Sequence, residues 1–127
     1  MNLLLDTSVF LWYITNDKRL SKNFLIEIEN KSNDVYLSVI SIWECIIKQQ
    51  IGKLNFPKPT AEYLTTQRDR HNIFALPLDE FSLFFLSELP LIHKDPFDRI
   101  LICQAKSNNL AIVTSDNLIK QYPVKIL

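Results

Sequence analysis

Short strand-like segments that alternate with helical segments are the feature that most constrains the fold of this chain. The strand-like segments are apolar or rich in β-forming residues, and they occupy residues 2–5, 34–38, 73–76 and 110–114. Strands that alternate with helices form parallel sheets whose two faces are both covered. Because the chain has 127 residues, half of it would bury too small a core to fold alone. The pattern therefore predicts one α/β domain over residues 1–127.

Helical spacing and capping signals place helices between these strands. Ser21, Asp79 and Asp95 are expected to begin helices, because their side chains can accept bonds from the first free N–H groups. Gly52 is expected to follow the end of one helix, and Pro90 to close another. We predict helices over residues 7–15, 21–31, 41–51, 60–71, 79–89 and 96–107, a short helix after Asp116, and a final strand over residues 124–127.

Composition narrows the function classes. The single glycine, Gly52, excludes glycine-rich loops that bind phosphate or dinucleotides. The 14 basic and 14 acidic side chains cancel. The net charge alone would therefore not hold a nucleic acid, and any such partner must be held by local basic residues or by cations. Cys45 and Cys103 lie in apolar helical runs without ligand spacing, so we expect buried, reduced thiols rather than a disulfide or a zinc site.

Targeting signals are not expected in this sequence. Asp6 interrupts the first apolar run, which has no basic residues before it, so a secretory leader is not predicted. The apolar stretch 81–92 is short and contains Glu88 and Pro90, so it is not expected to span a membrane. These features predict a soluble, cytoplasmic protein.

Four carboxylates, Asp6, Glu44, Asp98 and Asp116, each interrupt an apolar context. Taken singly they have structural explanations: Asp6 and Asp98 suit helix starts, Asp116 suits a turn, and Glu44 can pair with Lys48 one turn later. If they converge, their mutual repulsion requires either a compensating cation or raised pKa values of the acids. Carboxylates with few histidines suit Mg²⁺ or Mn²⁺ better than zinc. The residues alone do not establish that the four acids meet.

Several segments that contain these acids follow one another in an order that covers almost the whole chain. They are Leu3–Ser8 with Leu11 and Trp12, Leu37–Glu44, Lys48–Leu54, Leu89–Arg99 with Gln104 and Ala105, and Ile112–Asp116. The segment Leu89–Arg99, which runs into an apolar helix, is the most specific of them. In these motifs the chain resembles the PIN-domain family, and within it the VapC-type toxins of bacterial toxin–antitoxin pairs.

The resemblance implies an α/β/α sandwich around a parallel sheet of four to five strands. It implies a Mg²⁺- or Mn²⁺-dependent endoribonuclease that hydrolyses RNA phosphodiester bonds as the toxin of such a pair. By position, Asp6, Glu44, Asp98 and Asp116 match the acidic quartet of the family and would be the catalytic and metal-binding residues. Asp6, Glu44 and Asp98 are expected to bind a first ion. Asp116 would either complete that metal site or recruit a second ion. The implied partners are an RNA substrate, a cognate antitoxin protein and a second copy of the chain.

Further residues near the quartet have two interpretations each. Thr7, Thr114 and Ser115 could orient the acids, or they could be ordinary cap and strand-end residues. Arg99 could bind phosphate or form a surface ion pair, and His93 could touch RNA or the partner. We expect Asp95 to cap a helix rather than bind the ion. A basic rim around the acids is expected from Lys48, Lys53, Arg68, Arg70 and Arg99.

Most aromatic side chains are expected in the core, and part of them could instead form a dimer surface or a groove for an antitoxin helix. They include Trp12, Trp43, Phe81, Phe84 and Phe85.

Two other function classes remain open at this point. One is a catalytically inactive PIN-like module that only binds a partner, and the intact acidic quartet argues against it. The other is a phosphatase or phosphoacceptor domain with Asp6 as the nucleophile. Aspartyl-phosphate enzymes of the haloacid-dehalogenase kind carry a second acid two residues later, where this chain has Ser8.

Overall fold

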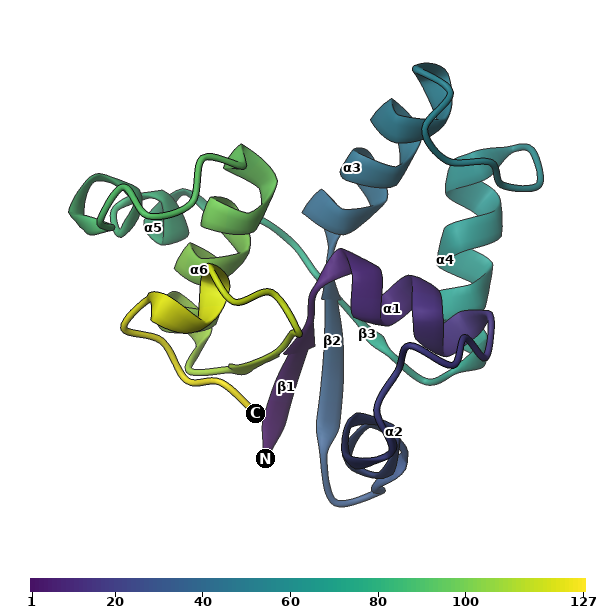
Figure 1. The fold of residues 1–127 in the computed structure, drawn as a ribbon, viewed down its shortest axis with the longest axis horizontal. Coiled ribbons are helices and arrows are strands. Elements are labelled where there is room, and N and C mark those ends of the chain that lie inside the picture. The colour runs from purple at the N-terminus through teal and green to yellow at the C-terminus, as the bar shows by residue number, and fades with distance from the viewer.

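A parallel sheet of four strands forms the centre of the molecule. The computed structural model describes all 127 residues. The strands are β1 (Asn2–Leu5), β2 (Asp34–Ser38), β3 (Phe74–Leu76) and β4 (Ala111–Val113), in the spatial order β3-β2-β1-β4. All three pairings are parallel. Helices lie on both sides of the sheet (Figure 1), so the expected α/β/α sandwich is confirmed.

Six α-helices and two short 3₁₀-helices connect and follow the strands. The α-helices are α1 (Thr7–Ile14), α2 (Lys22–Glu29), α3 (Val39–Gln50), α4 (Thr60–Arg70), α5 (Glu80–Leu83) and α6 (Pro96–Asn108), and the 3₁₀-helices are η1 (Leu86–Glu88) and η2 (Ile119–Gln121). None of these helices combines the length and the apolar character needed to cross a lipid bilayer.

Strand β1 shows why the sequence forms a sheet that is buried on both faces. Leu3, Leu4 and Leu5 are all fully buried, and side chains alternate between the two faces of a strand. Leu3 and Leu5 join the core formed with α1, α2 and α4, whereas Leu4 joins the core formed with α6. Burial of each leucine contributes about 1.5–3 kcal/mol, which explains why this run has no polar alternation.

The local signals at the helix ends are largely confirmed. The side chains of Ser21, Asp79 and Asp95 accept hydrogen bonds from backbone N–H groups at the starts of α2, α5 and α6. Gly52, with φ of +80°, follows the end of α3 in the left-handed conformation that favours glycine. Helix α3 begins earlier than predicted because the Ser38 hydroxyl accepts a bond from the N–H of Ile40 and acts as its cap.

The predicted helix over residues 79–89 is wrong. Only a single α-helical turn, α5, forms after Asp79, and the chain continues as the 3₁₀-helix η1. The α-helical pattern already gives way to i→i+3 bonds at Phe84 and Phe85, and Pro90 then prevents any α-helical bond to the Leu86 carbonyl, because it has no N–H and its ring would clash there. The Leu86 carbonyl accepts bonds from Leu89 N–H and Arg99 Nη2 instead, both at 3.4 Å.

Two further predictions need correction at the chain end and in the core. The predicted strand over residues 124–127 is reduced to one bridge, between Ile112 and Ile126, so the sheet has four strands and not five. The aromatic side chains are less buried than predicted: Trp43 is 55% exposed, Phe81 56% and Phe84 62%. Cys45 and Cys103, by contrast, are free and buried as expected.

Candidate metal centre

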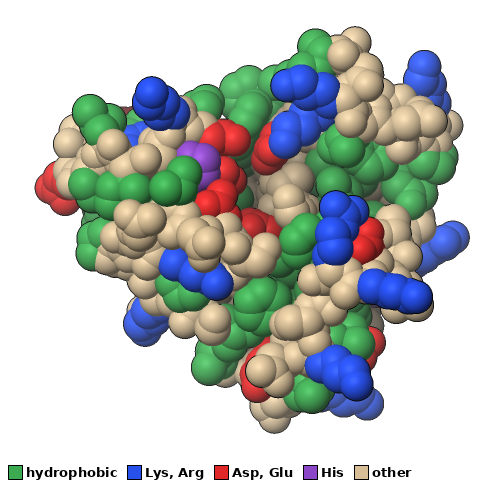
Figure 2. Space-filling model, viewed as in Figure 1, with side chains coloured by type: hydrophobic (Ala, Val, Ile, Leu, Met, Phe, Trp, Pro, Cys, Tyr) green, Lys and Arg blue, Asp and Glu red, His purple; other side chains and the backbone are tan.

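A cavity of about 220 Å³ lies at the edge of the sheet where the strands end. All four acids of the predicted quartet line it. The complete lining is Asp6, Thr7, Ser8, Trp12, Glu44, Lys48, Asp95, Asp98, Ser115 and Asp116. Figure 2 shows these acidic side chains gathered in a hollow at the centre of the visible face, with a histidine beside them.

The topology of the sheet explains why residues far apart in sequence share this cavity. Asp6 directly follows β1, and Asp116 lies three residues after the end of β4, the neighbouring strand. Glu44 lies on α3, which starts directly after β2, and Asp98 lies in the first turn of α6. In a parallel sheet the carboxyl ends of all strands lie at one edge, where ligands of α/β proteins bind.

Asp6 is held rigidly by two donors. Its Oδ1 accepts the N–H of Val9 at 2.8 Å, which makes Asp6 the cap of α1, and its Oδ2 accepts the hydroxyl of Thr114. Thr114 is fully buried. Burial raises the pKa of Asp6, the bonds from Thr114 and Val9 oppose this, and the charges of Asp116 and Glu44 raise it further.

Glu44 is buried and also has a partner for each oxygen. The Thr7 hydroxyl lies 2.7 Å from Oε1 and donates to it, and Lys48 Nζ donates to Oε2 at 2.6 Å. The Thr7 and Ser41 hydroxyl oxygens are 2.8 Å apart, so Ser41 steadies Thr7 in turn. Burial would lower the pKa of Lys48, but the bond to Glu44 and its negative charge raise it. Lys48 is therefore a charged partner of Glu44 in the metal-free protein.

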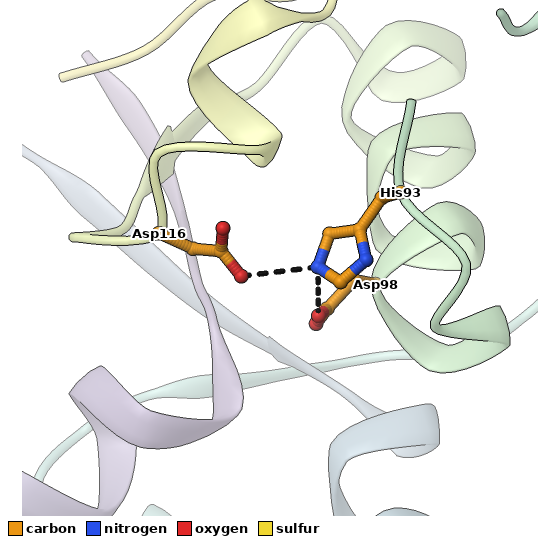
Figure 3. A group of neighbouring side chains, drawn as sticks. All are labelled: His93, Asp98 and Asp116. Carbon is orange, nitrogen blue, oxygen red and sulfur yellow. Dashed lines mark hydrogen bonds and ion pairs between the residues drawn. The ribbon is translucent and has the colours of Figure 1, made fainter. Parts of the chain in front are cut away.

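Asp98 and Asp116 lie on either side of His93. The Nε2 atom of His93 is 2.9 Å from Asp98 Oδ2 and 3.0 Å from Asp116 Oδ2 (Figure 3). Burial raises the pKa of Asp98 to about 7, reinforced by the charges of Asp95 and Glu44, and the charge that His93 carries when protonated opposes this only in part. Burial would also raise the pKa of Asp116, but bonds from the N–H of Leu118 and from His93 lower it.

The remaining predicted residues are placed as follows. Asp95 lines the cavity and caps α6 through bonds from the N–H groups of Phe97 and Asp98, in keeping with the expected capping role. Ser115 also lines the cavity. The guanidinium of Arg99 instead donates to the carbonyls of Pro90 and Leu86 and to the Tyr122 hydroxyl.

Arg99 therefore braces the segment before α6, and its contact with phosphate stays a prediction. The structure also reveals contacts that sequence reasoning missed. The partners of His93 come from the start of α6 and from the loop after β4, and no local pattern connects them. Tyr122, whose hydroxyl accepts the N–H groups of Ile92 and His93, is likewise not marked by any local pattern.

The donor set of this cavity fits a hard divalent cation. Its lining contains five carboxylates and one lysine, with His93 in contact with two of the acids. An oxygen of Asp98 and an oxygen of Asp116 lie within 4.8 Å of each other, a spacing that one ion can bridge, and a nitrogen of His93 lies within the same distance of both. Burial, and then the charges of Asp95 and Glu44, raise the pKa of Asp98, and a bound cation would favour its charged form.

The fold is similar to that of several solved structures. VapBC2 from Rickettsia felis, bound to a DNA fragment from its promoter, superimposes with a TM-score of 0.74 at 18% identity, over 100% of this chain and 97% of that one. VapBC-1 from nontypeable Haemophilus influenzae gives 0.67 at 18% identity, over 95% and 91% of the two chains. FitAcB from Neisseria gonorrhoeae gives 0.60 at 20% identity, over 98% and 96%.

These identities establish a shared fold only. A comparison with curated proteins gives no match. The sequence profile of the PIN domain, however, matches residues 3–125, which is nearly the whole chain. The chain therefore belongs to the PIN domain family.

Proposed function

We propose that this protein is a Mg²⁺- or Mn²⁺-dependent endoribonuclease that acts as the toxin of a toxin–antitoxin pair. The observation that supports the proposal most directly is that Asp6, Glu44, Asp98 and Asp116 all line one cavity. Such a concentration of negative charge is costly unless a cation is bound there. Membership in the PIN domain family makes nucleic acid the expected substrate class.

The hydrogen-bond partners of each acid indicate which acids would bind the cation directly. Asp98 and Asp116 would hold the cation together with Asp6, whose orientation is already fixed by Thr114 and the start of α1. Glu44 would join them, or act through a water molecule, because Lys48 already supplies a positive charge at its Oε2. When bound, the cation supplies charge that activates a water molecule and stabilises negative charge on the phosphoryl oxygens.

Lys48 is the one basic residue that lines the cavity. Its side chain is 38% exposed, so the ammonium group is accessible to an RNA phosphate while it remains paired with Glu44. A chain with zero net charge could bind RNA in this way, because the phosphates would contact Lys48 and the bound cation rather than an extended basic surface.

We also propose two protein partners. Two of the similar structures are VapBC complexes, and by analogy this chain would bind an antitoxin and act in the cytoplasm. The exposed Phe81 and Phe84, together with Trp43, are apolar surface that a partner or a second copy would cover. Co-purification of the chain with the product of an adjacent reading frame tests the antitoxin. Light scattering of the isolated chain tests the dimer.

Cleavage of RNA by the purified protein is the test of the activity. Asp6→Asn and Glu44→Gln should each abolish cleavage and growth inhibition while the protein stays folded, and removal of divalent ions with EDTA should abolish cleavage by the wild type. Asp34→Asn is the matched control, because Asp34 is exposed at the opposite end of β2. Full activity in the Asp6 or Glu44 variant would contradict the assignment. Mn²⁺ binding in the cavity without cleavage of any RNA would favour the inactive binding module.

A further inference from the structure

His93 lies in the loop between η1 and α6 and reaches into the acidic cluster. A single nitrogen, Nε2, contacts one oxygen of Asp98 and one of Asp116 (Figure 3). The side chain is only 12% exposed, so this contact is part of the packed structure. Its geometry alone allows two roles, because a ring nitrogen between two carboxylates can be a third metal ligand or a hydrogen-bond donor.

The second ring nitrogen distinguishes these roles. The backbone N–H of Asp95 donates to Nδ1 of His93 at 3.2 Å, so Nδ1 is an acceptor and carries no proton. The proton of the neutral ring must then be on Nε2, where it points at the two carboxylates; this tautomer is assigned from the hydrogen-bond partners. A histidine that binds a metal has the opposite arrangement, since its other nitrogen donates to a carboxylate, a carbonyl or water. Nδ1 of His93 faces a donor, the N–H of Asp95, and not an acceptor.

We infer that His93 is a positioning residue of the proposed metal site, whose Nε2–H bridges Asp98 and Asp116 and holds their carboxylates at a spacing that one cation can span. It is not itself a ligand. This inference rests on the proposed function, because it assigns a role within the same metal-dependent site. Each carboxylate has a second oxygen that His93 does not contact; Oδ1 of Asp116 accepts the N–H groups of Leu118 and Ile119 and would offer its remaining lone pair to the cation.

The loop that carries His93 is fixed independently of the acids. The N–H of His93 donates to the Tyr122 hydroxyl at 2.7 Å. Arg99 Nη1 donates to the same hydroxyl at 3.1 Å and to the Pro90 carbonyl at 2.9 Å. Tyr122 is buried. The imidazole is therefore set in place by the protein before any ion binds, as a positioning group requires.

The tautomer of His93 can be measured directly by ¹⁵N NMR of the protein, with His71 as an internal control. Nδ1 of His71 lies 2.7 Å from the carbonyl of Gln67, so His71 must carry its proton on Nδ1. We expect the opposite tautomer for His93, with the proton on Nε2, both in EDTA and after addition of Mg²⁺. A proton on Nδ1 of His93 in either state would overturn the inference.

The affinity for Mn²⁺ in the absence of RNA, measured by electron paramagnetic resonance, tests the consequence. His93→Phe keeps a ring but has no donor, and it should weaken Mn²⁺ binding by about tenfold. His93→Gln offers an N–H to the carboxylates and should stay within about threefold of the wild type. His71→Phe, at a site outside the cavity, should have no effect.

The outcomes separate this inference from the proposed function. Unchanged or tighter Mn²⁺ binding by folded His93→Phe would overturn the positioning role alone. An equal loss of Mn²⁺ affinity in the Phe and Gln variants would also overturn it, because it would indicate that His93 is a metal ligand. If the wild-type protein binds no Mn²⁺ at millimolar concentration, the metal site fails, and the proposed function fails with it.

Discussion

Replacing Asp98 by asparagine should make the metal-free protein more stable at pH 8, although Asp98 contacts His93. The reason is the position of its carboxylate, which is mostly buried among other acids. Its side chain is 17% exposed, and burial together with Asp95 and Glu44 raises its pKa to about 7. Asparagine has nearly the same shape, keeps an oxygen for the Nε2–H of His93, and carries no charge.

The magnitude follows from the two pKa values. The ordinary pKa of the side chain is 3.8, and the folded value is about 7. At about 1.4 kcal/mol per pKa unit, the charged form costs the folded state up to about 4 kcal/mol above pH 7. The folded state holds this proton more tightly than the unfolded state does. The penalty is therefore present above pH 7, shrinks as the pH falls below 7, and is gone below the ordinary pKa.

Urea denaturation in EDTA measures this effect. We expect the free energy of unfolding of Asp98→Asn to exceed that of the wild type by about 2–4 kcal/mol at pH 8, and the difference to fall towards zero near pH 4. Asp34→Asn should change stability by less than about 0.5 kcal/mol at either pH. Addition of Mg²⁺ should stabilise the wild type, by about 2.7 kcal/mol at a hundred times its Kd, and the variant much less.

If Asp98→Asn is less stable than the wild type in EDTA at pH 8, the hydrogen bond from His93 to the Asp98 carboxylate outweighs burial and repulsion. The acids would then form a self-sufficient structural network with no need for a cation.

Three further predictions concern the neighbours of the cluster. Thr7→Val removes the hydroxyl that donates to buried Glu44 and should lower the free energy of unfolding by about 1–3 kcal/mol in urea titrations; no loss would mean that Glu44 finds another donor. Lys48→Met leaves Glu44 without its counter-charge and should destabilise the protein in EDTA by about 1–3 kcal/mol, with partial recovery in Mg²⁺ as the sign that a cation replaces the ammonium group. Burial raises the pKa of Cys45 to about 12, and Cys103 is also buried, so neither thiol should react with a thiol reagent at pH 8 until the protein is denatured. Rapid reaction of the native protein would show that α3 or α6 opens.

Much of the fold could be predicted because its signals are local. The run Leu3–Leu5, the caps Ser21 and Asp95, and Gly52 each act through neighbouring residues, so their meaning is visible in the sequence. The early end of α5 at Leu83 is not explained by a local signal of this kind, because the missing N–H of Pro90 affects only the Leu86 carbonyl.

The grouping of the candidate site could be predicted only in part. Asp6 and Asp116 follow neighbouring strands, so the parallel topology places them at one edge of the sheet. The hydrogen-bond partners of the acids could not be predicted from the order of strands and helices. Thr114 binds Asp6 across 108 positions, and His93 binds Asp116 across 23, so each contact depends on the finished tertiary structure.

Anomalous diffraction from crystals soaked in Mn²⁺ is the most direct measurement of whether these acids share a cation. We expect a manganese peak inside the cavity, with carboxylate oxygens of Asp6, Asp98 and Asp116 among its ligands and with Nε2 of His93 outside the coordination sphere. An empty cavity at millimolar Mn²⁺, or a peak only at acids elsewhere on the surface, would contradict it.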